Sequence, residues 1–150
     1  MTVPPSRYAP GFRRWTAKEA PEWARRGGVF LIRSFIHILI ANRAKIKRHG
    51  CPVGTLCTEL AKLDHASQSE ANKVFALFRA WLRRQFTLLG RKSDADALAM
   101  HLLARSQGVA TLANAFHDEK FIRREVEEMC DWAESCAKAA APAGRARGRQ

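Results

Sequence analysis

The stretch SDADALAMHLLARSQGVATLANAF, residues 93–116, decides the fold. After Asp96 it contains a single residue that is charged at neutral pH, Arg105, and apolar residues occupy nearly every face of the helix that it predicts. Such a helix is stable only when its neighbours cover it on all sides. Gly108 costs about 1 kcal/mol relative to alanine in a helix interior, so we expect another helix to come close at this point. The stretch therefore predicts the buried central helix of a helical protein.

The rest of the chain continues the helical pattern. Apolar residues recur every three or four positions in four further segments, and no segment has the alternation of a β-strand. Pro52 suits the first position of a helix, and Gly90 suits a helix end. The predicted fold class is all-α, a bundle of about five main helices. The four further segments are 29–48, 52–64, 67–89 and 118–138.

The charge of the chain is concentrated at its ends. The net charge is +12, but residues 50–140 hold twelve Lys and Arg against twelve Asp and Glu, while residues 1–49 hold eleven against two. We therefore predict a basic, proline-rich and poorly ordered arm at 1–26, a helical domain at 27–138 and a disordered basic tail at 139–150. A binding module that contacts nucleic acid or acidic partners through these ends is an alternative function.

Several other classes of protein lack support in the sequence. The apolar segment that starts at Val29 is too short to cross a membrane, and no cleavage site for a signal peptide follows it. The four cysteines have no zinc spacing, and no motif combines a nucleophile with a base or cradles a phosphate. We expect a cytoplasmic protein that is not an enzyme, has no cofactor, metal or catalytic residue, and has no membrane partner.

The order of several short motifs resembles the C-terminal domain of TetR-family transcriptional regulators. These are Gly50-Cys51-Pro52-Val53-Gly54-Thr55-Leu56, then Glu59-Leu60, then a helix with Trp81, and then Leu102-Leu103-Ala104-x-x-Gln107-Gly108 before a charged last helix. The resemblance covers about residues 29–137. It implies a helical bundle that binds a small hydrophobic or amphipathic effector and forms dimers through its last two long helices, with itself or with full-length relatives.

The sequence departs from that family before Val29. Members of the family carry a helix-turn-helix domain there, and residues 1–28 are too few and too rich in proline to form one. We therefore expect no sequence-specific DNA binding by this chain alone. A truncated regulator and a stand-alone sensing domain both fit the sequence.

Two sets of site residues follow from the pattern and the resemblance. The predicted ligand-binding residues are apolar, aromatic or amide side chains that could share an interior, and the predicted dimer-interface residues lie on the last two helices. The ligand-binding set is Phe35, Leu39, Leu56, Leu60, Phe78, Trp81, Gln85, Met100, Leu103 and Gln107, with Leu82 and Phe86 beside them. The interface set is Ala104, Gly108, Ala110, Leu112, Phe121, Ile122, Val126 and Met129.

Overall fold

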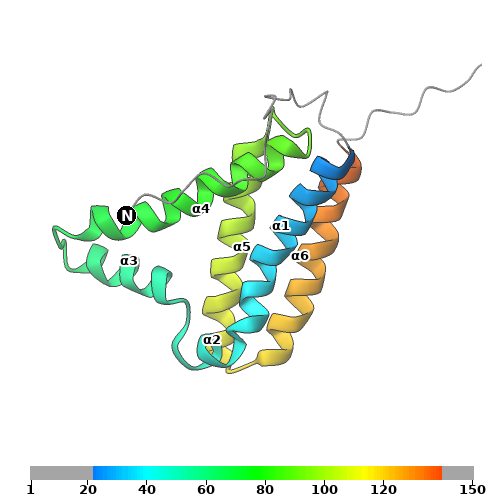
Figure 1. Ribbon diagram of the computed structural model, residues 1–150. Coiled ribbons are helices and arrows are strands. Elements are labelled where there is room, and N and C mark those ends of the chain that lie inside the picture. Colours follow the sequence, from blue (N-terminus) through cyan, green and yellow to red (C-terminus); the bar gives the residue numbers. More distant parts are fainter. Residues whose placement is uncertain (1–21, 140–150) are drawn as a thin grey trace, which may run out of the picture.

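The computed structural model describes residues 22–139, and this range contains six α-helices and no β-strand (Figure 1). The predicted all-α class is confirmed, with five longer helices and one short one. None of the described helices has the length and hydropathy needed to span a membrane. The helices are α1 (Glu22–Ala41), α2 (Arg43–His49), α3 (Pro52–Lys62), α4 (Gln68–Leu88), α5 (Ala95–Phe116) and α6 (Glu119–Ala139).

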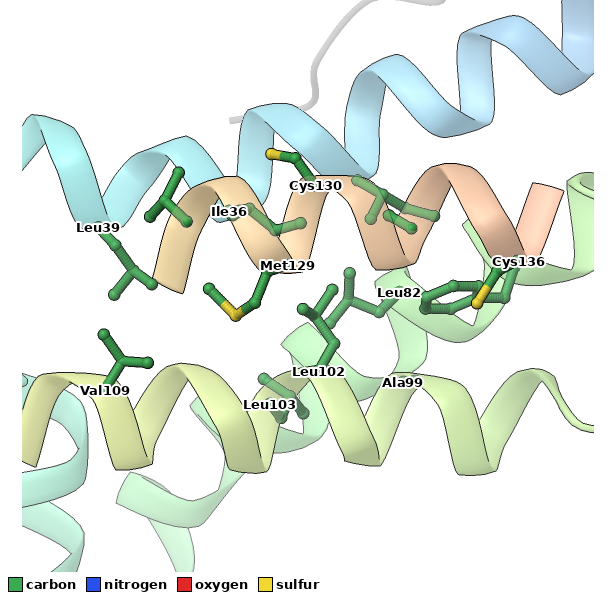
Figure 2. Close-up of a cluster of buried hydrophobic side chains, with 14 of the residues drawn as sticks. Ile36, Leu39, Leu82, Ala99, Leu102, Leu103, Val109, Met129, Cys130 and Cys136 are labelled. Atoms are coloured by element: carbon green, nitrogen blue, oxygen red, sulfur yellow. The ribbon is translucent and has the colours of Figure 1, made fainter. Parts of the chain in front are cut away.

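The core lies where α1, α5 and α6 run side by side and the second half of α4 packs against them (Figure 1). Figure 2 shows Ile36 and Leu39 of α1, Leu102 and Val109 of α5, and Met129 of α6 pointing into the same space. Burying a side chain of this size contributes about 1.5–3 kcal/mol relative to leaving it exposed. These helices therefore form a stable frame for the rest of the chain.

The second half of α4 packs closely against the bundle. A Cβ atom at Gly28 of α1 would lie 3.0 Å from Cδ2 of Leu89, so glycine allows the two helices to approach. The rings of Phe86 in α4 and Trp132 in α6 pack edge to face, with centroids 5.8 Å apart and an interplanar angle of 66°. Leu82 in the same half of α4 is fully buried.

The first half of α4 and the part of α3 beyond its first turn extend away from the bundle (Figure 1). None of the side chains of α3 is buried, and its main packing partner is α4. The apolar side of α3 is therefore only partly covered, and Leu56 and Leu63 remain exposed.

Polar contacts fix the end of the bundle where α2 lies. Gly50 ends α2 with φ +71°, a backbone conformation that suits glycine. Nδ2 of Asn114 donates a hydrogen bond to the carbonyl oxygen of Lys47 at 3.0 Å. Glu119 of α6 lies 3.1 Å from Nζ of Lys47 and 3.5 Å from Nε of Arg43. These contacts hold α2 against α5 and α6.

Two expectations about helix boundaries were wrong. The helix predicted over 29–48 is two helices, because the chain breaks at Asn42, whose φ of −107° and ψ of 10° are not helical. The first of them begins at Glu22 and passes residue 27 without interruption, so the predicted boundary between arm and domain falls inside a helix. The predicted arm up to residue 21 and the tail from residue 140 lie outside the described residues.

The central helix is also less covered than predicted. α5 is buried along one side, but Met100, Leu112 and Phe116 are 43%, 46% and 75% exposed. A single copy of the described chain therefore leaves one face of α5 in solvent.

Candidate functional site

A cavity of about 260 Å³ lies where α1, α2, α4, α5 and the start of α3 meet. This volume is slightly below the roughly 300–1,000 Å³ of most small-molecule pockets, so it suits a small ligand. The lining residues are Phe35, Ile38, Leu39, Asn42, Lys45, Ile46, Gly50, Cys51, Pro52, Val53, Phe78, Leu103, Ser106, Gln107 and Ala110.

The wall of the cavity is mostly apolar. Leu39, Leu103 and Ala110 are buried and belong to the core of the bundle. The rings of Phe35 and Phe78 meet edge to face, with centroids 5.8 Å apart. An aromatic or aliphatic ligand would therefore replace solvent along most of this surface.

Only a few polar side chains reach the cavity, and two of them are already hydrogen-bonded. Nδ2 of Asn42 donates to the carbonyl oxygen of Ile38 at 2.9 Å. The hydroxyl of Ser106 donates to the carbonyl oxygen of Leu103 at 2.8 Å. The amide of Gln107 has no hydrogen-bond partner among the described residues, which leaves it able to bind a ligand.

The start of α3 closes one side of the cavity through a close contact. Gly54 approaches Gln107 so nearly that a Cβ atom at Gly54 would collide with Oε1 of that amide. Pro52 occupies the first turn of α3, and Cys51 before it makes no side-chain cap. Glycine at residue 54 thus allows the backbone of α3 to lie directly against α5.

Half of the predicted ligand-binding residues line this cavity. They come from α1, α4 and α5, and the structure brings them together around one space. They are Phe35, Leu39, Phe78, Leu103 and Gln107.

The other predicted ligand-binding residues lie elsewhere. Leu56 and Leu60 belong to α3 beyond its first turn, where the helix has left the bundle and does not line the cavity. Trp81 lines a shallow surface groove between α1 and α4, and Met100 lines another between α4 and α5. Gln85 is buried but lines none of these hollows.

Gln85 carries an orphaned polar atom in the bundle. Its Nε2 lies 3.4 Å from the carbonyl oxygen of Trp81, while Oε1 is buried without a hydrogen-bond partner. Leu82 and Phe86, which were predicted to lie beside the ligand, are fully buried in the core.

The wall formed by the α1–α2 junction and the first turn of α3 was not predicted from the sequence. Asn42 is the residue at the break between α1 and α2, and Ile38, Lys45 and Ile46 lie on either side of it. Gly50 followed by Pro52 could have indicated this wall, because a helix end directly before a helix start brings the two helices together at a short turn. The break at Asn42 had no comparable signal.

The predicted interface residues also divide into two groups. Ala104, Gly108 and Leu112 are exposed along α5, and Phe121 is half-buried. The other four are each at most 2% exposed, so they pack in the core of a single copy. They are Ala110, Ile122, Val126 and Met129.

The exposed face of α5 contains no Asp, Glu, Lys or Arg. Gly108 has open space around it, since a Cβ atom there would meet nothing within 4 Å. Beside this face, Nη2 of Arg105 donates to Oε2 of Glu125 at 2.9 Å, and the ring of His101 lies 4.8 Å from that of Trp132. The exposed residues of α5 are Ala97, Met100, His101, Ala104, Gly108, Thr111, Leu112, Ala115 and Phe116.

The cysteines and other possible ligands do not form a second site. All four cysteines are free, and the described residues contain no group of three or more His, Cys, Asp or Glu side chains that could hold a metal ion. Burial raises the pKa of the Cys130 and Cys136 thiols above their usual value. A raised pKa lowers the fraction of reactive thiolate at neutral pH.

The model of the LmrA/YxaF-like transcriptional regulator C-terminal domain matches residues 31–128, which is roughly two thirds of the chain. The matched range runs from the middle of α1 into α6 and includes every helix that forms the cavity. No curated protein sequence matches the chain. The all-α fold agrees with this family, and the chain therefore belongs to the LmrA/YxaF-like C-terminal domains of TetR-type transcriptional regulators.

Proposed function

We propose that this domain binds a small, mostly apolar effector in the cavity at the α1–α2 junction and serves transcriptional regulation. The cavity is the observation that carries the proposal, because an apolar space with a few polar groups is the usual form of a small-molecule site. Membership of a family of transcriptional regulators supports the regulatory role.

The position of the cavity gives a way for the effector to change the conformation of the domain. Ile38 and Ile46 both line the cavity, and they lie on opposite sides of the break at Asn42. A ligand that contacts both residues would favour one angle between α1 and α2. A ligand shifts such an equilibrium only by its difference in affinity for the two conformations, so contacts on both sides of the break are what the mechanism requires.

We further propose that two copies pair through the uncharged face of α5, either two copies of this chain or one copy with a full-length relative. Ala104, Gly108 and Leu112 are four residues apart and lie on one side of the helix. Small residues at the first two positions allow a partner helix to come close. Phe121 and Trp132 of α6 would extend the contact around a two-fold axis.

The alternative of a binding module with basic ends receives less support. Its arm and tail fall largely outside the described residues. Within the described part, α2 is strongly basic, but Arg43 and Lys47 are engaged by Glu119.

Ligand-induced stabilisation tests the effector proposal. A ligand at a hundred times its dissociation constant stabilises the native state by about 2.7 kcal/mol, so a screen of small apolar molecules by thermal unfolding should find compounds that raise Tm. Val53→Trp should fill the cavity from the α3 side and abolish that shift. Leu56→Trp is the matched control, since Leu56 is on the same helix and does not line the cavity.

The outcomes are distinct. Binding that is lost in Val53→Trp and retained in Leu56→Trp supports the proposal. A screen without any stabilising compound, or a shift that survives in Val53→Trp, contradicts it.

A further inference from the structure

The lining of the cavity carries one charge. Of its fifteen residues, only Lys45 is charged at neutral pH, and none is acidic. The remaining polar side chains are neutral. Lys45 is exposed, so its side chain borders the cavity where the cavity meets solvent, and a ligand there would lie beside one basic residue and no acidic one.

Lys45 differs from the basic residues on either side of it. Arg43 and Lys47, which also belong to α2, both lie within ion-pair distance of Glu119. Lys45 makes no ion pair and no hydrogen bond with any other residue in the part of the chain that the structure describes. Its ammonium group is thus free to bind an anion, and no carboxylate competes for it.

The neutral polar side chains of the lining are also compatible with a ligand that carries an anionic oxygen. The amide of Gln107 has no hydrogen-bond partner among residues 22–139, so its Nε2 can donate to a ligand oxygen. Ser106 is already bonded to the backbone of its own helix. Lys45 and Gln107 are therefore the polar side chains of the lining that make no hydrogen bond among the described residues, and most of the wall around them is aromatic or aliphatic.

We infer that the effector of this site is a small molecule with an apolar body and one negatively charged group, and that Lys45 selects for that charge. The inference rests on the proposed function of the same cavity. A carboxylate bound to the ammonium group forms a charge-assisted hydrogen bond, which is stronger than a bond between neutral groups. The apolar body of the ligand provides most of the buried area, and its charge makes the cavity bind it more tightly than a neutral ligand of the same size.

Three probes of equal chain length test the inference: decanoate, decanol and decylamine, each kept below its aggregation concentration. Calorimetric titration of the full chain should give the order decanoate, decanol, decylamine, with decanoate bound about three- to fivefold more tightly than decanol, because an ion pair with an exposed lysine contributes about 1 kcal/mol or less. Phenylbutyrate and phenylbutanol, used in the same way, distinguish an aromatic body from an aliphatic one.

Two variants remove one positive charge each from α2. Lys45→Met should remove the preference, so that decanoate and decanol bind within about twofold of each other. Arg48→Met is the control, because Arg48 is on the same helix and does not line the cavity. It should leave the preference unchanged, which separates a local contact from the general attraction of a basic protein for anions.

The results separate this inference from the proposed function. If decanol binds as tightly as decanoate to the wild-type chain, and Val53→Trp abolishes the binding of both, the cavity binds ligands but the inferred charge selection is wrong. Equal loss of the preference in Arg48→Met and Lys45→Met also overturns the inference. If none of the probes binds, the inference fails, and the thermal screen decides the effector proposal separately.

Discussion

Two alanines on α5 allow a matched test of the proposed pairing. Ala104 is exposed on the uncharged face, whereas Ala113 is 0% exposed and packs in the core. The same substitution, alanine to glutamate, can be made at both positions of one helix. The side chain, the change in charge and the helix propensity are then equal, and only the surroundings differ.

The expected cost to the folded monomer differs strongly between the two variants. Glutamate at an exposed helical position changes stability by about 0.5 kcal/mol or less. At residue 113, which lines no cavity, the longer side chain overpacks the core, which costs about 1–3 kcal/mol, and an uncompensated buried charge adds about 3–5 kcal/mol. The sum of roughly 4–8 kcal/mol is comparable to the whole stability of a typical domain, about 5–15 kcal/mol. We expect Ala113→Glu to unfold largely and Ala104→Glu to stay folded.

The expected effect on pairing is the reverse of the effect on folding. In the proposed dimer, Ala104→Glu places one carboxylate from each copy in a dry contact between helices. At about 3–5 kcal/mol for an uncompensated charge, the dissociation constant should rise at least about a hundredfold. Sedimentation velocity over a range of concentrations measures the association, and circular dichroism measures the helix content of the same samples.

Two results would refute this reasoning. Wild-type protein that sediments as a monomer at micromolar concentration removes the proposed dimer. An Ala104→Glu variant that associates as tightly as wild type shows that any dimer uses another surface.

Three further predictions concern single sites. Gly50→Ala should destabilise the fold by about 1–3 kcal/mol in urea unfolding, because φ is +71° at this residue; a cost below 0.5 kcal/mol would show that the turn relaxes. The hydrogen bonds from Arg91 hold the pKa of Asp94 below its usual value, so this carboxylate stabilises the fold above about pH 4, and the contribution is lost as the pH falls through the lowered pKa. Asp94→Asn should therefore lower Tm at neutral pH and change it little in acid, and an equal effect at both pH values would contradict the assignment. Iodoacetamide should modify the half-buried Cys51 and Cys57 before Cys130 and Cys136, because burial raises the thiol pKa of the latter two. Mass spectrometry of native and unfolded protein measures the order of modification, and equal rates in the native state would disprove the prediction.

The helical class could be predicted because it depends on local pattern. The apolar spacing of the α5 and α6 segments specifies helices in whatever position they pack. The break at Asn42 was not predictable in this way, because Ile36, Leu39 and Ile46 keep a helical spacing across it. When the helix direction changes but the spacing of the apolar residues does not, the sequence pattern cannot show the change.

The candidate site was predictable only in part, since periodicity identifies the apolar side of a helix and not the surface that covers it. Leu56 lies on the apolar side of α3, but α3 packs beside the exposed start of α4. Val126 has the spacing of an interface residue and equally that of a core residue, and the structure places it in the core. Only the three-dimensional arrangement distinguishes these cases.

The position of α3 outside the bundle has a consequence for the exchange of amide hydrogens with solvent. Because none of its side chains is buried, separating α3 from α4 exposes little apolar surface and should require far less free energy than global unfolding. Its amides should exchange much faster than those of α5 or α6. The first turn of α3 is also one wall of the cavity, so in the proposed function a local opening of α3 would admit the ligand while the bundle remains intact. A bound ligand would then slow exchange in α3 selectively, with the amides of the bundle core unchanged.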